Sequence, residues 1–155
     1  MAAPRGRDAR AELGRRCRAF AQRSVKLVVD AGVAVAASAT PVGFARFRRF
    51  ELMAPPLLWV EAVSALHAAM WRGELRRAQA EPTLERILGA PIRRSEPKAL
   101  AREAWAVADE FGWAKTYDAN YVALARMLRC RLVTLDARLR RGTARLGFVI
   151  GPTEL

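Results

Sequence analysis

Two apolar segments of this chain each end directly at an aspartate. Val25–Val29 lacks the alternation of a half-exposed strand and leads into Asp30, and Leu132–Asp136 ends in the same way. Such runs are typical of strands buried on both faces of a parallel sheet. Because sites in open parallel sheets form at the carboxyl ends of the strands, the two aspartates are candidates for one site. The alternative is that each aspartate only caps the helix that follows it.

The segments between these strands carry helix signals. Leu57–Trp71 is long and almost uncharged, and Pro97–Phe111 begins with proline and precedes a glycine. Thr116 is expected to cap a helix over Tyr117–Arg129. An alternation of strands and helices predicts an α/β layer fold with a mainly parallel sheet. The remaining expected elements are an exposed amphipathic helix over 44–52, short helices over 32–38 and 82–88, and strands over 90–93 and 148–150.

Length and cysteine content fit one domain that folds without disulfides. A chain of 155 residues buries roughly 70% of its unfolded surface. Cys17 and Cys130 fit neither a Cys-x-x-Cys motif nor a zinc spacing, which indicates a reducing, cytoplasmic setting. His67 is the only histidine, so His-rich metal sites are excluded. The apolar stretch between Pro56 and Arg72 is shorter than the roughly 20 residues that a membrane span needs.

The balance of charge is strongly basic. The chain has 27 Lys and Arg residues against 15 Asp and Glu residues, which gives a net charge of +12. This excess predicts a polyanionic partner. A GC-rich genome is an alternative reason for the preference of Arg over Lys, but it does not account for the excess of positive charge.

The basic residues begin at the N-terminus. Residues 1–24 contain seven Arg and two acidic residues, and we expect a basic arm that is poorly ordered or loosely helical, or that reflects a translation start placed too early. Together with the apolar residues 25–39, this arm is similar to a signal peptide. Asp30 interrupts the apolar stretch, so we expect no secretion and assign the folded domain to residues 25–155.

Two further carboxylates lie in apolar surroundings. Glu61 is the only charge in the helix predicted over 57–71, and its neighbours one turn away are apolar or small. Asp118 falls in the first turn of the next predicted helix, on an apolar face. The alternatives are that Glu61 reaches solvent or a distant Arg, and that Asp118 serves only the helix dipole. Thr134 lies on the same side of its strand as Asp136, where it would orient a carboxylate or a water.

Clustered acids with almost no histidine suit hard cations such as Mg²⁺ or Mn²⁺. Such ions stabilise the charge of a phosphoryl transition state and activate water. The Arg excess would collect a polyanion around this acidic pocket. Residue chemistry therefore indicates a metal-dependent nuclease.

Three segments of the chain, in their residue pattern and their order, resemble a known protein family. VVDAGVAV, WVEAVSALHAAMWRGEL and GWAKTYDANYVALARMLRCRLVTLDARL strongly resemble the PIN-domain ribonuclease toxins of bacterial VapBC toxin-antitoxin modules. The resemblance covers about residues 25–150 and leaves the basic arm outside. It implies an acidic pocket with a supporting hydroxyl at Thr134 and Mg²⁺ ligands that are principally Asp30 and Asp118, joined by Asp136. The four acids of that pocket are Asp30, Glu61, Asp118 and Asp136.

The resemblance also implies how such a protein works. It implies a three-layer α/β/α sandwich, a homodimer, endonucleolytic cleavage of RNA that arrests translation, and a cognate antitoxin that blocks the acidic pocket. Ser64 departs from the pattern, because relatives often carry Asn there. Two alternatives stay open, namely a catalytically silent RNA-binding adaptor on the same fold and a housekeeping PIN-like nuclease in RNA processing or DNA repair.

Overall fold

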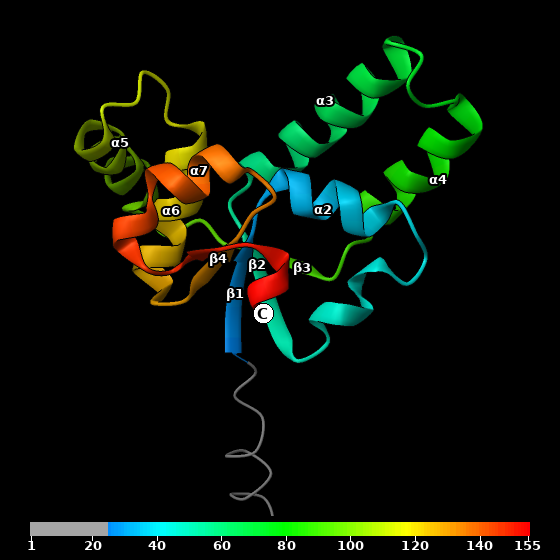
Figure 1. The fold of residues 1–155 in the computed structure, drawn as a ribbon. Helices are drawn as coiled ribbons and strands as arrows, with labels where there is room; N and C mark the ends of the chain where they lie inside the picture. Colours follow the sequence, from blue (N-terminus) through cyan, green and yellow to red (C-terminus); the bar gives the residue numbers. More distant parts are fainter. Residues whose placement is uncertain (1–24) are drawn as a thin grey trace, which may run out of the picture.

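The computed structural model describes residues 25–155, which form one parallel sheet covered by helices on both faces (Figure 1). The five strands have the order β3-β2-β1-β4-β5, and every neighbouring pair is parallel. The expected three-layer α/β/α sandwich is confirmed. The strands are β1 (Val25–Val29), β2 (Phe50–Ala54), β3 (Ile92–Arg94), β4 (Arg131–Val133) and β5 (Val149–Ile150).

The helices divide between the two faces of the sheet. In Figure 1, α2, α3 and α4 lie on one side, and α5, α6 and α7 lie on the other. This division is expected from the strand order. The chain runs outward from β1 to β3 and then crosses back to β4, and right-handed connections between parallel strands place helices on opposite faces when the direction reverses. The helices are α2 (Ala31–Ser38), α3 (Leu57–Trp71), α4 (Arg77–Leu88), α5 (Leu100–Phe111), α6 (Tyr117–Leu128) and α7 (Ala137–Gly142).

The strand order reverses between β1 and β4, and this reversal fixes where a site can form. In an open parallel sheet the helices diverge at such a point and leave a crevice beyond the carboxyl ends of the strands. Val29 pairs with Val133 at the end of both strands. Asp30 follows β1 at once, and Asp136 follows β4 by three residues. Both aspartates therefore lie beyond the carboxyl ends of β1 and β4. The strand predicted over Leu132–Asp136 is wrong at its end, because β4 covers Arg131–Val133 and leaves Thr134 and Asp136 in the segment before α7.

The prediction of a helix over residues 44–52 is wrong. The structure has a short 3₁₀ helix over Gly43–Phe47 and then strand β2. The arginines and aromatics of this segment give a helix-like pattern, but pairing on both sides of β2 decides its conformation. Phe50 pairs with Val25 of β1, and Leu52 pairs with Ile92 of β3. Pairings this distant in sequence leave no signal in a local window.

Other boundaries shift for local reasons. Helix α4 begins before Pro82 and includes it within the helix, so the predicted turn over 82–88 was too short. Helix α5 begins at Leu100, because the residues after Pro97 first form a turn in which the Leu100 amide donates to the Pro97 carbonyl at 2.8 Å. Thr116 stands at the start of α6, but its side chain makes no capping hydrogen bond. The strand Val25–Val29 and the helix Leu57–Trp71 are confirmed residue for residue.

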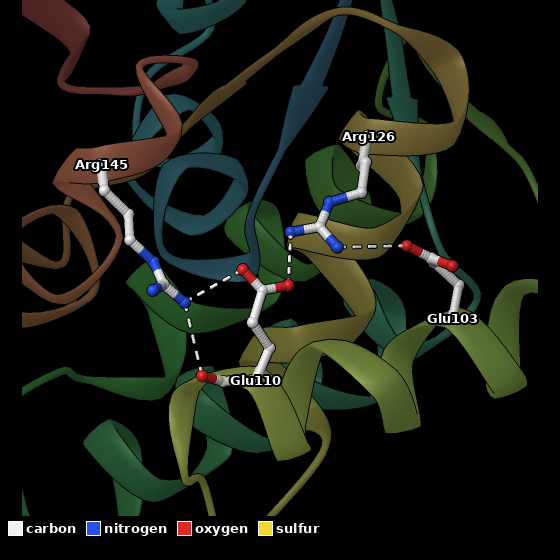
Figure 2. A network of polar contacts seen from close by, with 4 residues as sticks. All are labelled: Glu103, Glu110, Arg126 and Arg145. Atoms are coloured by element: carbon white, nitrogen blue, oxygen red, sulfur yellow. Dashed lines mark hydrogen bonds and ion pairs between the residues drawn. The ribbon is translucent and has the colours of Figure 1, made fainter.

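An ion-pair network fastens α6 to α5 (Figure 2). Arg126 of α6 lies between two carboxylates of α5, 3.3 Å from Glu103 and 2.9 Å from Glu110. Arg145, in the 3₁₀ helix Ala144–Leu146, reaches Glu110 from the other side at 3.0 Å. Its guanidinium also lies 4.4 Å from the centre of the Phe111 ring. These contacts fix the position of α6, whose first turn carries Asp118.

The basic arm at residues 1–24 lies outside the described residues. Within residues 25–155, no helix combines the length and apolar character needed to cross a membrane. Cys130 is a free thiol, and burial raises its pKa.

The buried face of α6 is the centre of the domain, and its loss should be costly. Leu124 is fully buried in the main core, and we expect Leu124→Ala to lower the free energy of unfolding by about 2–5 kcal/mol, because it leaves a cavity. Leu88→Ala removes the same atoms from a half-exposed side chain at the end of α4, and we expect a change within about 0.5 kcal/mol. Urea unfolding followed by circular dichroism measures both, and equal losses would contradict this view of the core.

Candidate acidic active site

Asp30 is held at both of its carboxylate oxygens. As the residue that precedes α2, it accepts a hydrogen bond at Oδ1 from the Val33 amide at 2.7 Å, so it caps the helix. Its Oδ2 accepts a hydrogen bond from the Thr134 hydroxyl. The side chain is buried, with 9% of its surface exposed. Its orientation is therefore fixed by one bond from its own helix and one from β4's end.

Thr134 and Asp136 complete this part of the crevice. Thr134 is fully buried, and its Oγ1 accepts a hydrogen bond from the Asp136 amide at 2.9 Å while its hydrogen goes to Asp30. Asp136 caps α7, because its Oδ1 accepts from the Arg138 amide at 2.6 Å and from the Leu139 amide at 3.2 Å. The capping interpretation thus holds for both aspartates, and capping brings their carboxylates to the same edge.

Glu61 meets a residue that the sequence analysis did not assign to the site. The Tyr121 hydroxyl of α6 donates to Glu61 Oε2 of α3 at 2.5 Å, across the junction of the two helical layers. Tyr121 is only 2% exposed and Glu61 is half-buried. A signal was present in the sequence. Tyr121 lies one turn after Asp118 on an otherwise apolar helix face, where a phenol needs a partner.

Asp118 is exposed in the first turn of α6. No hydrogen bond to its carboxylate comes from residues 25–155. Partial loss of water and the nearby charge of Asp136 raise its pKa, and Arg138 offsets part of this rise. Asp118 therefore carries a carboxylate that lies near Asp136 and Arg138 and accepts no hydrogen bond from the described residues.

The four carboxylates lie close enough to repel one another. Burial raises the pKa of Asp30 against the lowering effect of its hydrogen bonds, and the charges of Asp118 and Asp136 raise it further. Burial also raises the pKa of Glu61, with smaller contributions from Asp118 and Asp30. Hydrogen bonds of Thr134 join Asp30 to the backbone of Asp136, and the charge effects place Asp118 and Glu61 in the neighbourhood of Asp30.

This negative charge is not neutralised by the rest of the domain. Across residues 25–155, none of the four acids takes part in an ion pair with Lys or Arg. In the same part of the chain, no group of three or more His, Cys, Asp and Glu side chains is arranged to hold a metal ion. Carboxylate oxygens are nonetheless the ligands that hard divalent cations prefer, and Mg²⁺ usually binds through one or two of them and keeps several waters.

Two other polar residues of α3 stand apart from this crevice. Ser64 is exposed. His67 lines a separate hollow between α3 and α4 that also includes Met70 and Arg77. The structure thus leaves the single histidine outside the acidic edge.

Comparison with known proteins places the chain in a family. Residues 27–144 match the PIN domain family. The chain is 34% identical over 115 residues to VapC ribonuclease Mb0985 of Mycobacterium bovis and to ribonuclease VapC9 of Mycobacterium tuberculosis, which covers 73% of this chain and 87% of each relative. The crystal structure of PAE2754 from Pyrobaculum aerophilum superposes with a TM-score of 0.68 at 26% identity, over 85% of this chain and 93% of that one.

The matched region contains the last three residues of β1, all of β4 and all four acids of the candidate site, so the family match and the geometry describe the same part of the molecule. The chain belongs to the PIN-domain family, as one of its VapC-type members.

Proposed function

We propose that this protein is the toxin of a toxin-antitoxin pair, an Mg²⁺-dependent endoribonuclease that arrests translation by cutting RNA. The observation that carries the proposal is the cluster of four carboxylates without cationic partners in residues 25–155, at the strand-order reversal of a chain with a net charge of +12. The relatives are named as ribonucleases, which supports RNA as the substrate.

The donor set supports Mg²⁺, with Mn²⁺ as a substitute. Carboxylate oxygens suit hard cations, and Mg²⁺ usually binds through one or two carboxylates while it keeps several waters. Asp30, Asp118 and Asp136 would hold the ion. When bound, it would stabilise the charge that develops on the phosphate during hydrolysis.

The chain's own residues would prepare the reaction. Thr134 and the Val33 amide orient the Asp30 carboxylate, and Tyr121 orients Glu61. Glu61 would position the attacking water and accept its proton, because its raised pKa improves proton uptake near neutral pH. Arg138, close enough to Asp118 to affect its pKa, would contact the phosphodiester.

Partners follow from the same proposal. A cognate antitoxin would inhibit the protein by covering the acidic pocket, and a cationic group from that antitoxin would neutralise the carboxylates. A second copy of the chain would form a homodimer. Arrest of growth on expression, relieved by the product of a neighbouring gene, would distinguish a toxin from a silent adaptor and from a housekeeping nuclease.

Asp118→Asn removes the negative charge of a carboxylate that has no hydrogen-bond donor among residues 25–155, with almost no change in side-chain volume. We expect cleavage of RNA to fall by about 100-fold or more, because an oriented group at the reacting centre is lost. Purified wild-type and variant proteins are compared with Mg²⁺, Mn²⁺ or chelator. Circular dichroism checks that the variant is folded, and a folded variant that cuts at the wild-type rate would contradict the proposal.

The same substitution should stabilise the chelated protein. The carboxyl group of Asp118 has a raised pKa in the folded state, so its charged form opposes folding, and this opposition appears as the pH rises through the raised pKa. We expect Asp118→Asn to melt at a higher temperature than wild type at pH 7 without metal, and this gain to shrink at acidic pH. Addition of Mg²⁺ should raise the melting temperature of the wild type more than that of the variant.

The pH profile of cleavage should depend on Tyr121. Protonation of Glu61 removes its role, and its raised pKa places the acidic loss of activity above the ordinary carboxyl range. The hydrogen bond from Tyr121 lowers this pKa, so Tyr121→Phe should move the acidic limb of kcat/KM to higher pH. Profiles of both proteins at constant ionic strength measure the difference, and superimposable limbs would refute the role of Tyr121.

Binding of RNA should weaken steeply with salt. Contacts between Arg and phosphate release counterions, and three such contacts reduce affinity by about tenfold or more between 50 and 200 mM salt. Fluorescence anisotropy with chelated protein and a labelled single strand measures this slope. An affinity that does not change with salt would show that contacts between Arg and phosphate do not contribute to RNA binding.

A further inference from the structure

A second cavity adjoins the acidic edge. It has a volume of about 620 Å³ and lies between the start of α3, the segment that joins β3 to α5, and the first turn of α6. This volume is within the usual range of about 300–1,000 Å³ for small-molecule sites. The lining includes the polar or charged residues Glu96, Lys98, Thr116, Tyr117 and Asn120, and the exposed apolar residue Val60.

Two residues that line this cavity are the sequence neighbours of acids of the candidate site. Val60 immediately precedes Glu61 on α3, and Tyr117 immediately precedes Asp118 on α6. The same two helices therefore carry carboxylates toward the crevice and these neighbours toward the cavity. A strand of RNA with a phosphate at the carboxylates would bring its next nucleotide to the cavity.

The lining has the chemistry that single-stranded RNA requires. Tyr117 is 54% exposed, and aromatic rings at such positions stack on unpaired bases. Lys98 lines the cavity, and Lys115 Nζ lies 6.0 Å from the centre of the Tyr117 ring. The aromatic surface is thus accompanied by two cations that suit a phosphate.

Polar groups for a base edge are also present. Asn120 donates from Nδ2 to the Thr116 carbonyl at 2.7 Å, which leaves its own carbonyl oxygen without a partner among residues 25–155. Glu96 supplies carboxylate oxygens to the same lining. Acceptors of this kind pair with the exocyclic amino groups of bases, so the cavity can distinguish one base from another.

We propose that this cavity is a subsite for one nucleotide of a single-stranded RNA, adjacent to the phosphate that is cut. Tyr117 stacks on the base, Lys98 contacts a phosphate, and Glu96 and Asn120 contact the base edge. This inference rests on the proposed ribonuclease function and extends it to the choice of cleavage position.

The test compares Tyr117→Ala, Tyr117→Phe and Lys98→Ala with two matched controls. Trp71→Ala removes an exposed aromatic ring at the far end of α3, and Lys26→Ala removes an exposed lysine near the amino end of β1. Each protein is assayed with Mg²⁺ on short RNAs that differ by one base on either side of the cut. RNA binding by chelated protein is measured in parallel.

We expect Tyr117→Ala to raise KM by about fivefold or more, the loss of one stacked base, and to weaken the preference for a base beside the cut. Tyr117→Phe should retain stacking and resemble wild type. Lys98→Ala should weaken binding for all sequences and reduce its salt dependence. Both controls should behave as wild type.

The outcomes separate this subsite from the nuclease function. If wild type binds RNA but does not cut it, the proposed function fails, and weaker binding by Tyr117→Ala still supports the subsite. If wild type cuts RNA and Tyr117→Ala keeps both KM and base preference, the subsite is refuted. A Tyr117→Ala protein that changes only its oligomeric state would assign the cavity to a contact between proteins instead.

Discussion

The Thr134 hydroxyl is the group on which the arrangement of the acidic edge depends. It gives its hydrogen to Asp30 after β1 and accepts the amide hydrogen of Asp136 after β4. These two strands lie side by side where the strand order reverses, so one buried hydroxyl fixes the carboxylate of Asp30 and the backbone of Asp136 at once. A valine at this position would fill the same space but leave the Asp136 amide and one oxygen of Asp30 without this partner, and buried polar groups without partners are costly.

The distribution of arginines keeps this edge negative in a basic protein. Arg126 and Arg145 are engaged with glutamates of α5, and Arg86 donates from Nε to the Ser38 carbonyl at the end of α2, at 2.5 Å. These guanidinium groups stabilise helix junctions instead of neutralising the crevice. Burial and the charge that remains raise the pKa of Asp30, Glu61 and Asp118, and under the proposed function a divalent cation or a cationic side chain of a partner would offset that charge.

The secondary-structure elements that the sequence predicts best are those set by a local residue pattern or by one hydrophobic run. The strand before Asp30 and the helix that carries Glu61 both have the predicted bounds, because each is a mainly apolar run with a clear end. Strand β2 was not predictable in this way, since pairing with β1 and β3 outweighs its local pattern. The hydrogen bond from Tyr121 to Glu61 was also missed. It joins helices on opposite faces of the sheet, and no spacing rule within one helix indicates such a contact.

The residues that form the candidate site are far apart in the sequence, and this separation affects when the site can assemble during translation. Asp30 and Thr134 are 104 positions apart, and β4 is inserted beside β1 only after the helices between them have been made. A ribosome that is still producing this chain therefore carries no assembled acidic edge. Under the proposed function, a polypeptide that ends before β4 lacks Thr134 and Asp136 and with them part of the residues that would cut RNA.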